Sequence, residues 1–226
     1  LDLRLFPYVD ILNIATGGHA GSREHALELA QRAFDHGKLF TAHFGYTDRE
    51  NFGRIEHKWN SKFILDQLKI QWMNLPSLTE LGGWKWVKFH GALYNRLMSD
   101  QKLAEDLIVW LVQEGFEGII APKNSEQAKT AKKYQLEVKN ELFIERRYVL
   151  SDLGIPYLMP REMEGAVIEE LEEAIMQYIN ISTNREIEIK NLSGDFISYV
   201  LEGDTVCVHS DSKIAFKLVK VIDRLK

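Results

Sequence analysis

Short apolar runs alternate along the chain with longer segments whose apolar residues recur with a helical period. The runs predict buried strands at 39–43, 84–90, 118–122, 136–141 and 205–209. The periodic segments predict amphipathic helices at 23–36, 62–75, 101–114, 126–134, 169–179 and 213–225. We expect Ser22 and Asp100 to cap two of these helices. The apolar face of the first helix is expected at Ala26, Leu27, Ala30, Ala33 and Phe34.

Strands that alternate with helices of this length indicate βαβ units and a parallel sheet, so we expect an α/β fold. Two stretches break the alternation. Residues 185–201 alternate apolar and polar side chains around a turn at 191–195, which predicts an antiparallel hairpin. Residues 143–161 contain Gly154, Pro156 and Pro160 with little periodicity and are expected to be a long loop. No linker or repeat interrupts the chain, which predicts a single domain over residues 1–226.

Composition narrows the function classes. The 226 residues carry a net charge of −5 without a basic block, which argues against binding to nucleic acid or to an anionic membrane. The apolar runs are too short to span a bilayer. A single cysteine, Cys207, excludes an internal disulfide framework and multi-cysteine metal sites. Because no segment has the pattern of a secretory signal, we expect a cytoplasmic protein.

Histidine and glutamate stand where the apolar runs end, and the carboxyl ends of parallel strands converge on one face of such a fold. A single histidine at such a position is more often structural than functional, but four of the seven in this chain occupy strand ends. Imidazole and carboxylate are suited to general acid–base chemistry and to divalent metals. The residues concerned are His19, His43, His90, Glu141 and His209.

Polar residues around these positions could contact a substrate. Asp48 and Arg54 follow His43 in a glycine-containing segment, where they could position polar groups of a ligand. The alternative is that this segment is an ordinary solvated turn. Lys88 and His90 share a face of their strand, although Lys88 could instead extend its ammonium group to solvent.

The densest charge cluster is Glu141, Glu145, Arg146 and Arg147, with Tyr148 beside them. Arginine suits a carboxylate or phosphate, whereas the alternative is a surface salt-bridge cluster. Cys207 lies two residues before His209, but a buried structural thiol is favoured over a nucleophile. His19, His43 and His90 are candidate metal ligands, although no compact metal motif is present. The chain has neither a Walker A loop nor G-x-G-x-x-G, hence no standard phosphate-binding loop.

Several segments occur in a characteristic combination over residues 9–211. They read Asn-Ile-Ala-Thr-Gly-Gly-His-Ala-Gly at 13–21, His-Phe-Gly-Tyr at 43–46, Asn-Phe-Gly-Arg at 51–54 and Val-Lys-Phe-His-Gly-Ala-Leu-Tyr-Asn at 87–95, with shorter ones at 145–148, 158–161, 165–168 and 204–209. Together they resemble the LamB/YcsF family, the A-subunits of 5-oxoprolinase. The resemblance implies an irregular parallel β/α barrel of the seven-stranded type, similar to that of metal-dependent carbohydrate deacetylases.

The resemblance also implies an activity, the ATP-dependent opening of 5-oxo-L-proline to L-glutamate. It implies two partner subunits, B and C, which would handle ATP and phosphorylate the lactam while this chain supports hydrolysis. The family usually opens with a strand ending Asn-Cys-Asp-Leu-Gly-Glu, and nothing before Phe6 matches it. We therefore expect the first family strand to be absent from this chain. Other departures from the family pattern are Thr16, Gly18, Ser22, Phe44, Phe89 and Glu145.

We expect a hydrolase in which His43 and His90 exchange protons with the attacking water and the departing ring nitrogen. Glu141 would orient one of them, or ligate a metal ion if one is bound. Residues expected to bind substrate are His19, Lys88, Asp48, Arg54, Tyr94, Arg146, Arg147 and His209. Whether a divalent metal takes part is left open. The alternatives are a metal-dependent deacetylase or amidohydrolase acting on a carbohydrate, and a non-catalytic assembly subunit.

Overall fold

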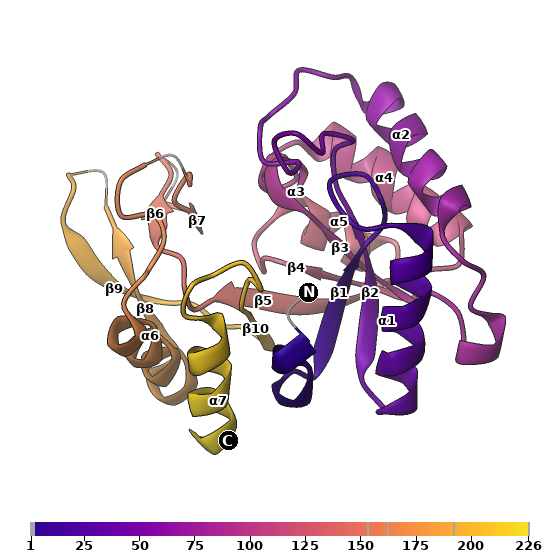
Figure 1. Cartoon of the computed structure of the whole chain (residues 1–226). Helices are drawn as coiled ribbons and strands as arrows, with labels where there is room; N and C mark the ends of the chain where they lie inside the picture. The colour runs from indigo at the N-terminus through magenta and orange to yellow at the C-terminus, as the bar shows by residue number, and fades with distance from the viewer. Residues whose placement is uncertain (1–2, 153, 162, 192, 226) are drawn as a thin grey trace. The chain divides into compact units, whose positions relative to one another are not determined.

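The computed structural model describes residues 3–152, 154–161, 163–191 and 193–225 (Figure 1). The chain divides into two compact units. The larger unit is Asp10–Lys139, and the smaller unit combines Leu1–Val9 with Asn140–Lys226. A single domain over residues 1–226 stays a prediction.

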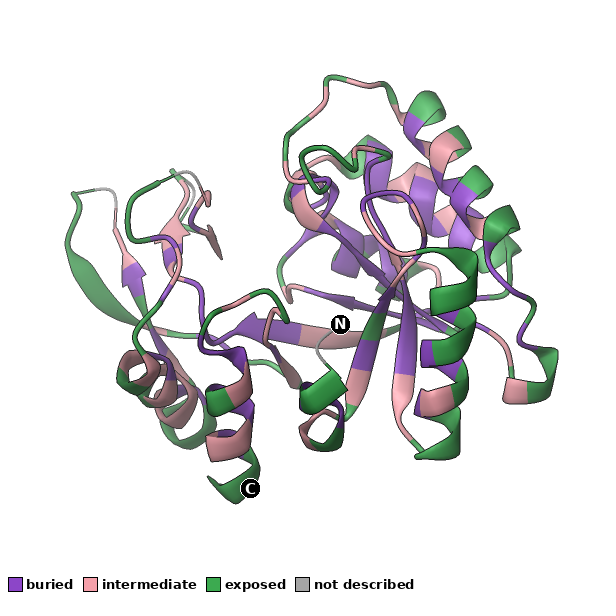
Figure 2. Cartoon of the chain, viewed as in Figure 1, coloured by how far each residue is buried: buried purple, intermediate pink, exposed green. Residues whose placement is uncertain are grey.

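The larger unit is built on parallel strands connected through helices. Its strands are β1 (Ile11–Ala15), β2 (Leu39–Phe44), β3 (Trp86–Phe89) and β4 (Gly118–Ala121), paired in that order. Its helices are α1 (Arg23–Asp35), α2 (Ser61–Asn74), α3 (Gly91–Arg96), α4 (Gln101–Gln113) and α5 (Glu126–Lys133), with a short 3₁₀ helix, η2 (Thr79–Leu81). Every residue of β3 and β4 is buried, whereas the helices expose their outer faces (Figure 2).

Side-chain caps fix where the helices begin. Ser22 accepts a hydrogen bond from the amide of His25, and Asp100 accepts one from the amide of Leu103, as expected from the sequence. The expected face of α1 is partly wrong, because Leu27 and Phe34 are exposed. The buried positions are Ala26, Leu29, Ala30 and Ala33, whose spacing of three and four residues keeps them on one side of the helix.

Strand β5 (Glu137–Phe143) begins in the larger unit and ends in the smaller one, where it pairs in parallel with β10 (Thr205–Cys207). A separate four-stranded sheet has the order β7 (Pro156–Leu158), β6 (Tyr148–Leu150), β8 (Glu186–Lys190) and β9 (Phe196–Val200). The smaller unit also contains η1 (Leu3–Tyr8), α6 (Leu171–Asn184) and α7 (Ala215–Leu225).

The α/β class, the parallel strands and the hairpin of β8 and β9 are confirmed. The long loop expected over 143–161 is wrong, because Tyr148 pairs with Leu158 and Leu150 pairs with Pro156 in an antiparallel ladder. Strands of three residues are too short to show alternation, and proline is tolerated as the first residue of an edge strand. Among the described residues, no helix is long and apolar enough to cross a membrane.

Candidate functional site

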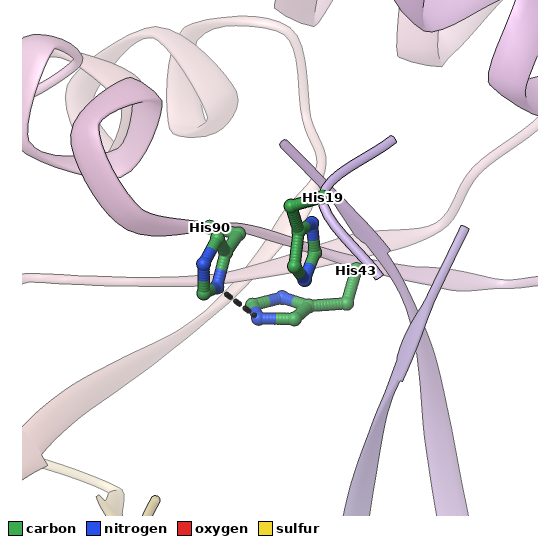
Figure 3. A group of neighbouring side chains, drawn as sticks. All are labelled: His19, His43 and His90. Atoms are coloured by element: carbon green, nitrogen blue, oxygen red, sulfur yellow. Dashed lines mark hydrogen bonds between the residues drawn. The ribbon is translucent and has the colours of Figure 1, made fainter. Parts of the chain in front are cut away.

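Three of the histidines expected at strand ends come together in the larger unit (Figure 3). His19 lies in the loop between β1 and α1, His43 is in β2, and His90 directly follows β3 and precedes α3. One nitrogen from each ring lies within 4.8 Å of those of the other two. We call these residues the histidine cluster.

His43 and His90 face one another through their ring nitrogens. Nε2 of His43 lies 3.0 Å from Nδ1 of His90. The other nitrogen of each ring contacts a backbone carbonyl, Nδ1 of His43 at 2.9 Å from Lys88 O and Nε2 of His90 at 2.9 Å from Phe52 O. Because a carbonyl oxygen only accepts, both of these outer nitrogens carry a hydrogen. In the neutral rings, the two facing nitrogens then present lone pairs.

His19 completes the cluster by stacking on His90. Their ring centroids are 3.7 Å apart with planes inclined by 6°, while the His43 ring is nearly perpendicular to that of His19. Phe52 contacts both stacked rings in steeply inclined, T-shaped arrangements, with centroid distances of 5.6 Å to His19 and 5.7 Å to His90. Nδ1 of His19 is buried and has no hydrogen-bond partner among the described residues.

Glycines make room for these rings. A Cβ atom at Gly45 would lie 2.7 Å from Nδ1 of His19 and 3.2 Å from Cβ of His90. One at Gly53 would lie 2.9 Å from Cβ of His19. Gly53 also has a φ of +65°, in the left-handed region that favours glycine. The segments around 43–46 and 51–54 therefore use glycine to admit the cluster.

The cluster is poorly suited to hold protons at neutral pH. Burial lowers the pKa of His43 well below its ordinary value, and the neighbouring His90, His19 and Lys88 lower it further. Burial, with the positive charges of Arg54 and Arg49, lowers the pKa of His19 to about 4. His19 and His43 are therefore neutral imidazoles at pH 7, with lone pairs available to a ligand.

A buried polar network that the sequence did not reveal supports the cluster. The Thr16 hydroxyl donates to Oε1 of Gln71 at 2.7 Å, and Nε2 of Gln71 donates to Gly45 O at 2.8 Å. Gly18 permits this packing, because a Cβ there would lie 2.6 Å from the Gln71 amide. The signal in the sequence that could have identified Gln71 is its position three residues after Leu68, which puts a polar side chain on the buried face of α2.

Asp48 and Arg54 lie on the segment beside the cluster. Asp48 accepts hydrogen bonds from the backbone and side chain of Asn51, and its Oδ2 lies 3.1 Å from Nε2 of His57. The Arg54 guanidinium lies 4.8 Å from the ring centroid of Phe52. Asp48 thus has a role in shaping the loop, while Arg54 brings positive charge close to His19.

The alternative interpretation, in which Lys88 extends its ammonium group to solvent, is wrong. Only 4% of Lys88 is exposed, and its Nζ lies 5.9 Å from the ring centroid of Tyr94, which is also buried. A buried ammonium group placed next to the cluster in sequence provides a fixed positive charge in this unit.

The other expected site residues belong to the smaller unit. Glu141, Glu145 and Arg146 are all at least 95% buried, so a surface salt-bridge cluster is the wrong interpretation for them. Both carboxylate oxygens of Glu145 lie 3.1 Å from the amide nitrogen of His209, and Nδ1 of His209 contacts Oε1. Glu145 is a member of the expected charge cluster but not of the expected site residues.

The two arginines have different surroundings. Arg146 donates to the carbonyls of Ala166 at 3.2 Å and Met159 at 2.6 Å, so it anchors backbone. Arg147 is partly exposed and forms an ion pair with Glu173 at 2.5 Å. Cys207 is buried, in agreement with the structural role favoured for its thiol.

Comparison with known proteins identifies relatives along almost the whole chain. The chain is 33% identical to the A-subunit of 5-oxoprolinase from Erwinia tasmaniensis, over 93% of this chain and 84% of that protein. It is 32% identical to the A-subunit of 5-oxoprolinase from Halalkalibacterium halodurans, over 97% of this chain and 83% of that protein.

A solved structure is similar throughout. The crystal structure of the lactam utilization protein from Thermus thermophilus matches with a TM-score of 0.75 and 26% identity, covering all of this chain and 90% of that one. The model of the LamB/YcsF family matches residues 1–226. The chain therefore belongs to the LamB/YcsF family.

Proposed function

We propose that this chain is the hydrolytic component of an ATP-dependent 5-oxoprolinase, which opens the lactam of 5-oxo-L-proline to L-glutamate. The observation that carries the proposal is the histidine cluster, three imidazoles within 4.8 Å in a chain whose relatives are named as A-subunits of 5-oxoprolinase. The cluster lies near the carboxyl ends of the parallel strands β1, β2 and β3, and active sites of β/α folds usually lie at such ends.

The reaction makes specific demands on such a site. Water must add to the lactam carbonyl, the bond between that carbon and the ring nitrogen must break, and the ring nitrogen must receive a proton. We assign the facing nitrogens of His43 and His90 to the attacking water, because the outer nitrogens of both rings are engaged by backbone carbonyls. Lys88 and Arg54 would supply the positive charge that a developing oxyanion needs.

An unstrained five-membered lactam resists hydrolysis until its carbonyl oxygen becomes a better electron sink. Phosphorylation of that oxygen by ATP achieves this. Once the bond between the carbon and the ring nitrogen has broken, a second water would release the phosphoryl group as inorganic phosphate from the resulting acyl phosphate. The sequence of this chain has no standard phosphate-binding loop. We therefore propose that two partner subunits, B and C, bind ATP and activate the lactam, and that the complex works in the cytoplasm. The designation of the relatives as A-subunits supports an assembly of several chains.

Further substrate contacts are proposed for the other site residues expected from the sequence. Arg147 is the better arginine for the substrate carboxylate or the transferred phosphate, because Arg146 already donates to two backbone carbonyls. Glu141 and His209 belong to the smaller unit, and their roles as an orienting carboxylate and a further imidazole stay proposals from the sequence. His19, Asp48 and Tyr94 would shape the binding pocket.

The test is glutamate formation from 5-oxo-L-proline and ATP, measured for this chain alone, for the partner subunits alone, and for the complete mixture. We expect product only in the complete mixture. Absence of product from a mixture shown to assemble would contradict the proposal. Release of acetate from an acetylated sugar by this chain without ATP would instead favour a metal-dependent deacetylase, which the cluster of imidazoles also suits.

A further inference from the structure

The facing nitrogens of His43 and His90 pose an electrostatic problem. The outer nitrogen of each ring donates to a carbonyl, so two neutral rings direct two lone pairs at each other across 3.0 Å. Two lone pairs at that separation repel unless a positive species interacts with both of them. The species can be a proton, which makes the pair an imidazole hydrogen-bonded to an imidazolium, or it can be a metal ion.

The surroundings disfavour the proton. A proton would pair only His43 with His90, although one nitrogen of His19 also lies within 4.8 Å of the nitrogens of those two rings. A metal ion, unlike a proton, can bond to all three rings at once. Its bonds to several neutral nitrogens offset the free-energy cost of placing positive charge in a buried site.

Other features of the cluster are those of a metal site. Metal-ligating histidines almost always donate their second nitrogen to a carbonyl, carboxylate or water, which fixes the tautomer and the orientation of the ring. His43 and His90 do so through Lys88 O and Phe52 O. His19 adds a third ring, and its buried Nδ1 has no hydrogen-bond partner among the described residues. An unpaired buried nitrogen costs free energy, and a ligand bound at the His19 ring would offset that cost.

We infer that His19, His43 and His90 bind one divalent transition-metal ion of the zinc class. Tetrahedral zinc sites with bonds of 2.0–2.1 Å place ligand nitrogens about 3.3 Å apart, close to the 3.0 Å between His43 and His90. The nitrogen of His19 lies at most 4.8 Å from the nitrogens of His43 and His90, so His19 would move by about 1.5 Å at most to reach the spacing of a zinc site. Three imidazoles without thiolate or carboxylate suit zinc, cobalt or nickel better than magnesium or calcium.

Three protein ligands leave a coordination position open, as in catalytic zinc sites. The positive charges of Lys88, Arg49 and Arg54 favour an anionic occupant of that position, such as hydroxide or a carboxylate of the substrate. The meaning of the ion for catalysis rests on the proposed function: with both facing nitrogens bound to the ion, His43 and His90 would act on the attacking water through the ion and not as direct proton acceptors. The binding of the ion does not rest on the proposed function.

The experiment measures binding in the absence of substrate. The full chain is stripped with a chelator and titrated with Co²⁺ and with Zn²⁺, following heat and the visible absorption of bound cobalt. We expect one equivalent per chain. Affinity should fall on the order of 100-fold or more in His43→Ala and in His90→Ala, beyond what the loss of a supporting residue causes. His25→Ala is the matched control, because His25 is an exposed histidine of α1.

His43→Gln and His90→Gln, checked for folding by thermal denaturation, guard against variants that fail to fold. Wild-type protein that is folded but binds neither ion would overturn the inference, as would unchanged affinity in folded variants of both His43 and His90. The two proposals fail separately. One bound equivalent without glutamate formation in an assembled complex contradicts the proposed function alone, whereas glutamate formation by a chain that binds no metal contradicts the metal site alone.

Discussion

Nε2 of His43 lies 3.0 Å from Nδ1 of His90, and the register of two neighbouring strands sets this contact. His43 in β2 pairs with Lys88 in β3, so the Lys88 carbonyl is placed to accept from Nδ1 of His43. His90 follows two residues later, directly after β3, where its amide donates to the Phe44 carbonyl at 2.7 Å. Parallel pairing therefore fixes the tautomer of one ring and the position of the other.

Gly53 offers a direct test of how tightly the cluster is packed. Gly53→Ala places a methyl group 2.9 Å from Cβ of His19, and we expect about a 100-fold loss of turnover, since a displacement near 1 Å is enough for that. Gly37→Ala is the matched control. Gly37 has nearly the same φ, +63° against +65°, but nothing lies within 4 Å of its added Cβ.

Both glycine variants should lose about 1–2 kcal/mol of unfolding free energy from backbone strain. Only Gly53→Ala should also lose activity and metal affinity. Stability is measured by urea denaturation and activity by glutamate formation. Equal activity of the two variants would show that contact with His19 is unimportant.

The buried amide of Gln71 should contribute to stability through its hydrogen bonds. Gln71→Ala leaves the Thr16 hydroxyl and the Gly45 carbonyl without this partner, and we expect a loss of about 1–3 kcal/mol in unfolding free energy. Gln31→Ala is the control, because Gln31 makes one exposed hydrogen bond to Asp35 and should change stability by less than about 0.5 kcal/mol. A loss as small for Gln71 as for Gln31 would contradict this role.

Arg146 and Arg147 should differ although they are adjacent. Arg146→Met removes donors to two buried carbonyls, and we expect a loss of about 2 kcal/mol or more in stability. Arg147→Ala removes a partly exposed ion pair worth about 0–1 kcal/mol, so the protein stays folded while the KM for 5-oxo-L-proline rises. Thermal denaturation and steady-state kinetics distinguish the two effects. An unchanged KM in Arg147→Ala would remove Arg147 from the substrate contacts.

Glu145 and His209 should be energetically coupled. A double-mutant cycle with Glu145→Gln and His209→Ala is expected to give a coupling of about 0.5–3 kcal/mol, because the carboxylate contacts both the ring and the backbone amide of His209. Glu186 and Ser198 provide a comparison pair, since their hydrogen bond is exposed. Additive effects of the two substitutions at Glu145 and His209 would contradict the coupling.

The sequence predicted those parts of the fold that have a strong local signal. The positions of His43 and His90 followed from apolar runs whose ends are easily recognised, and parallel connectivity then implied that the residues after those runs converge. Ser22 and Asp100 were predictable as caps, because the capping interaction is made within four residues of the chain.

Features that depend on distant contacts were missed. Gln71 lies 55 residues from Thr16, and nothing local distinguishes a glutamine that faces the core from one that faces solvent. Strands β6 and β7 are three residues long, too short for alternation to be seen. Leu27 and Phe34 are exposed because position on a helix, and not hydrophobicity alone, decides which side chains are buried.

The claim that the histidine cluster is the reacting centre is tested most directly by glutamate formation in the assembled complex with His90→Ala in place of the wild-type chain. His36→Ala serves as a control, because His36 is an exposed histidine at the end of α1. Our account predicts that His90→Ala folds, assembles and loses turnover by at least about 100-fold, while His36→Ala retains it. Near-normal turnover of an assembled complex containing His90→Ala would contradict it.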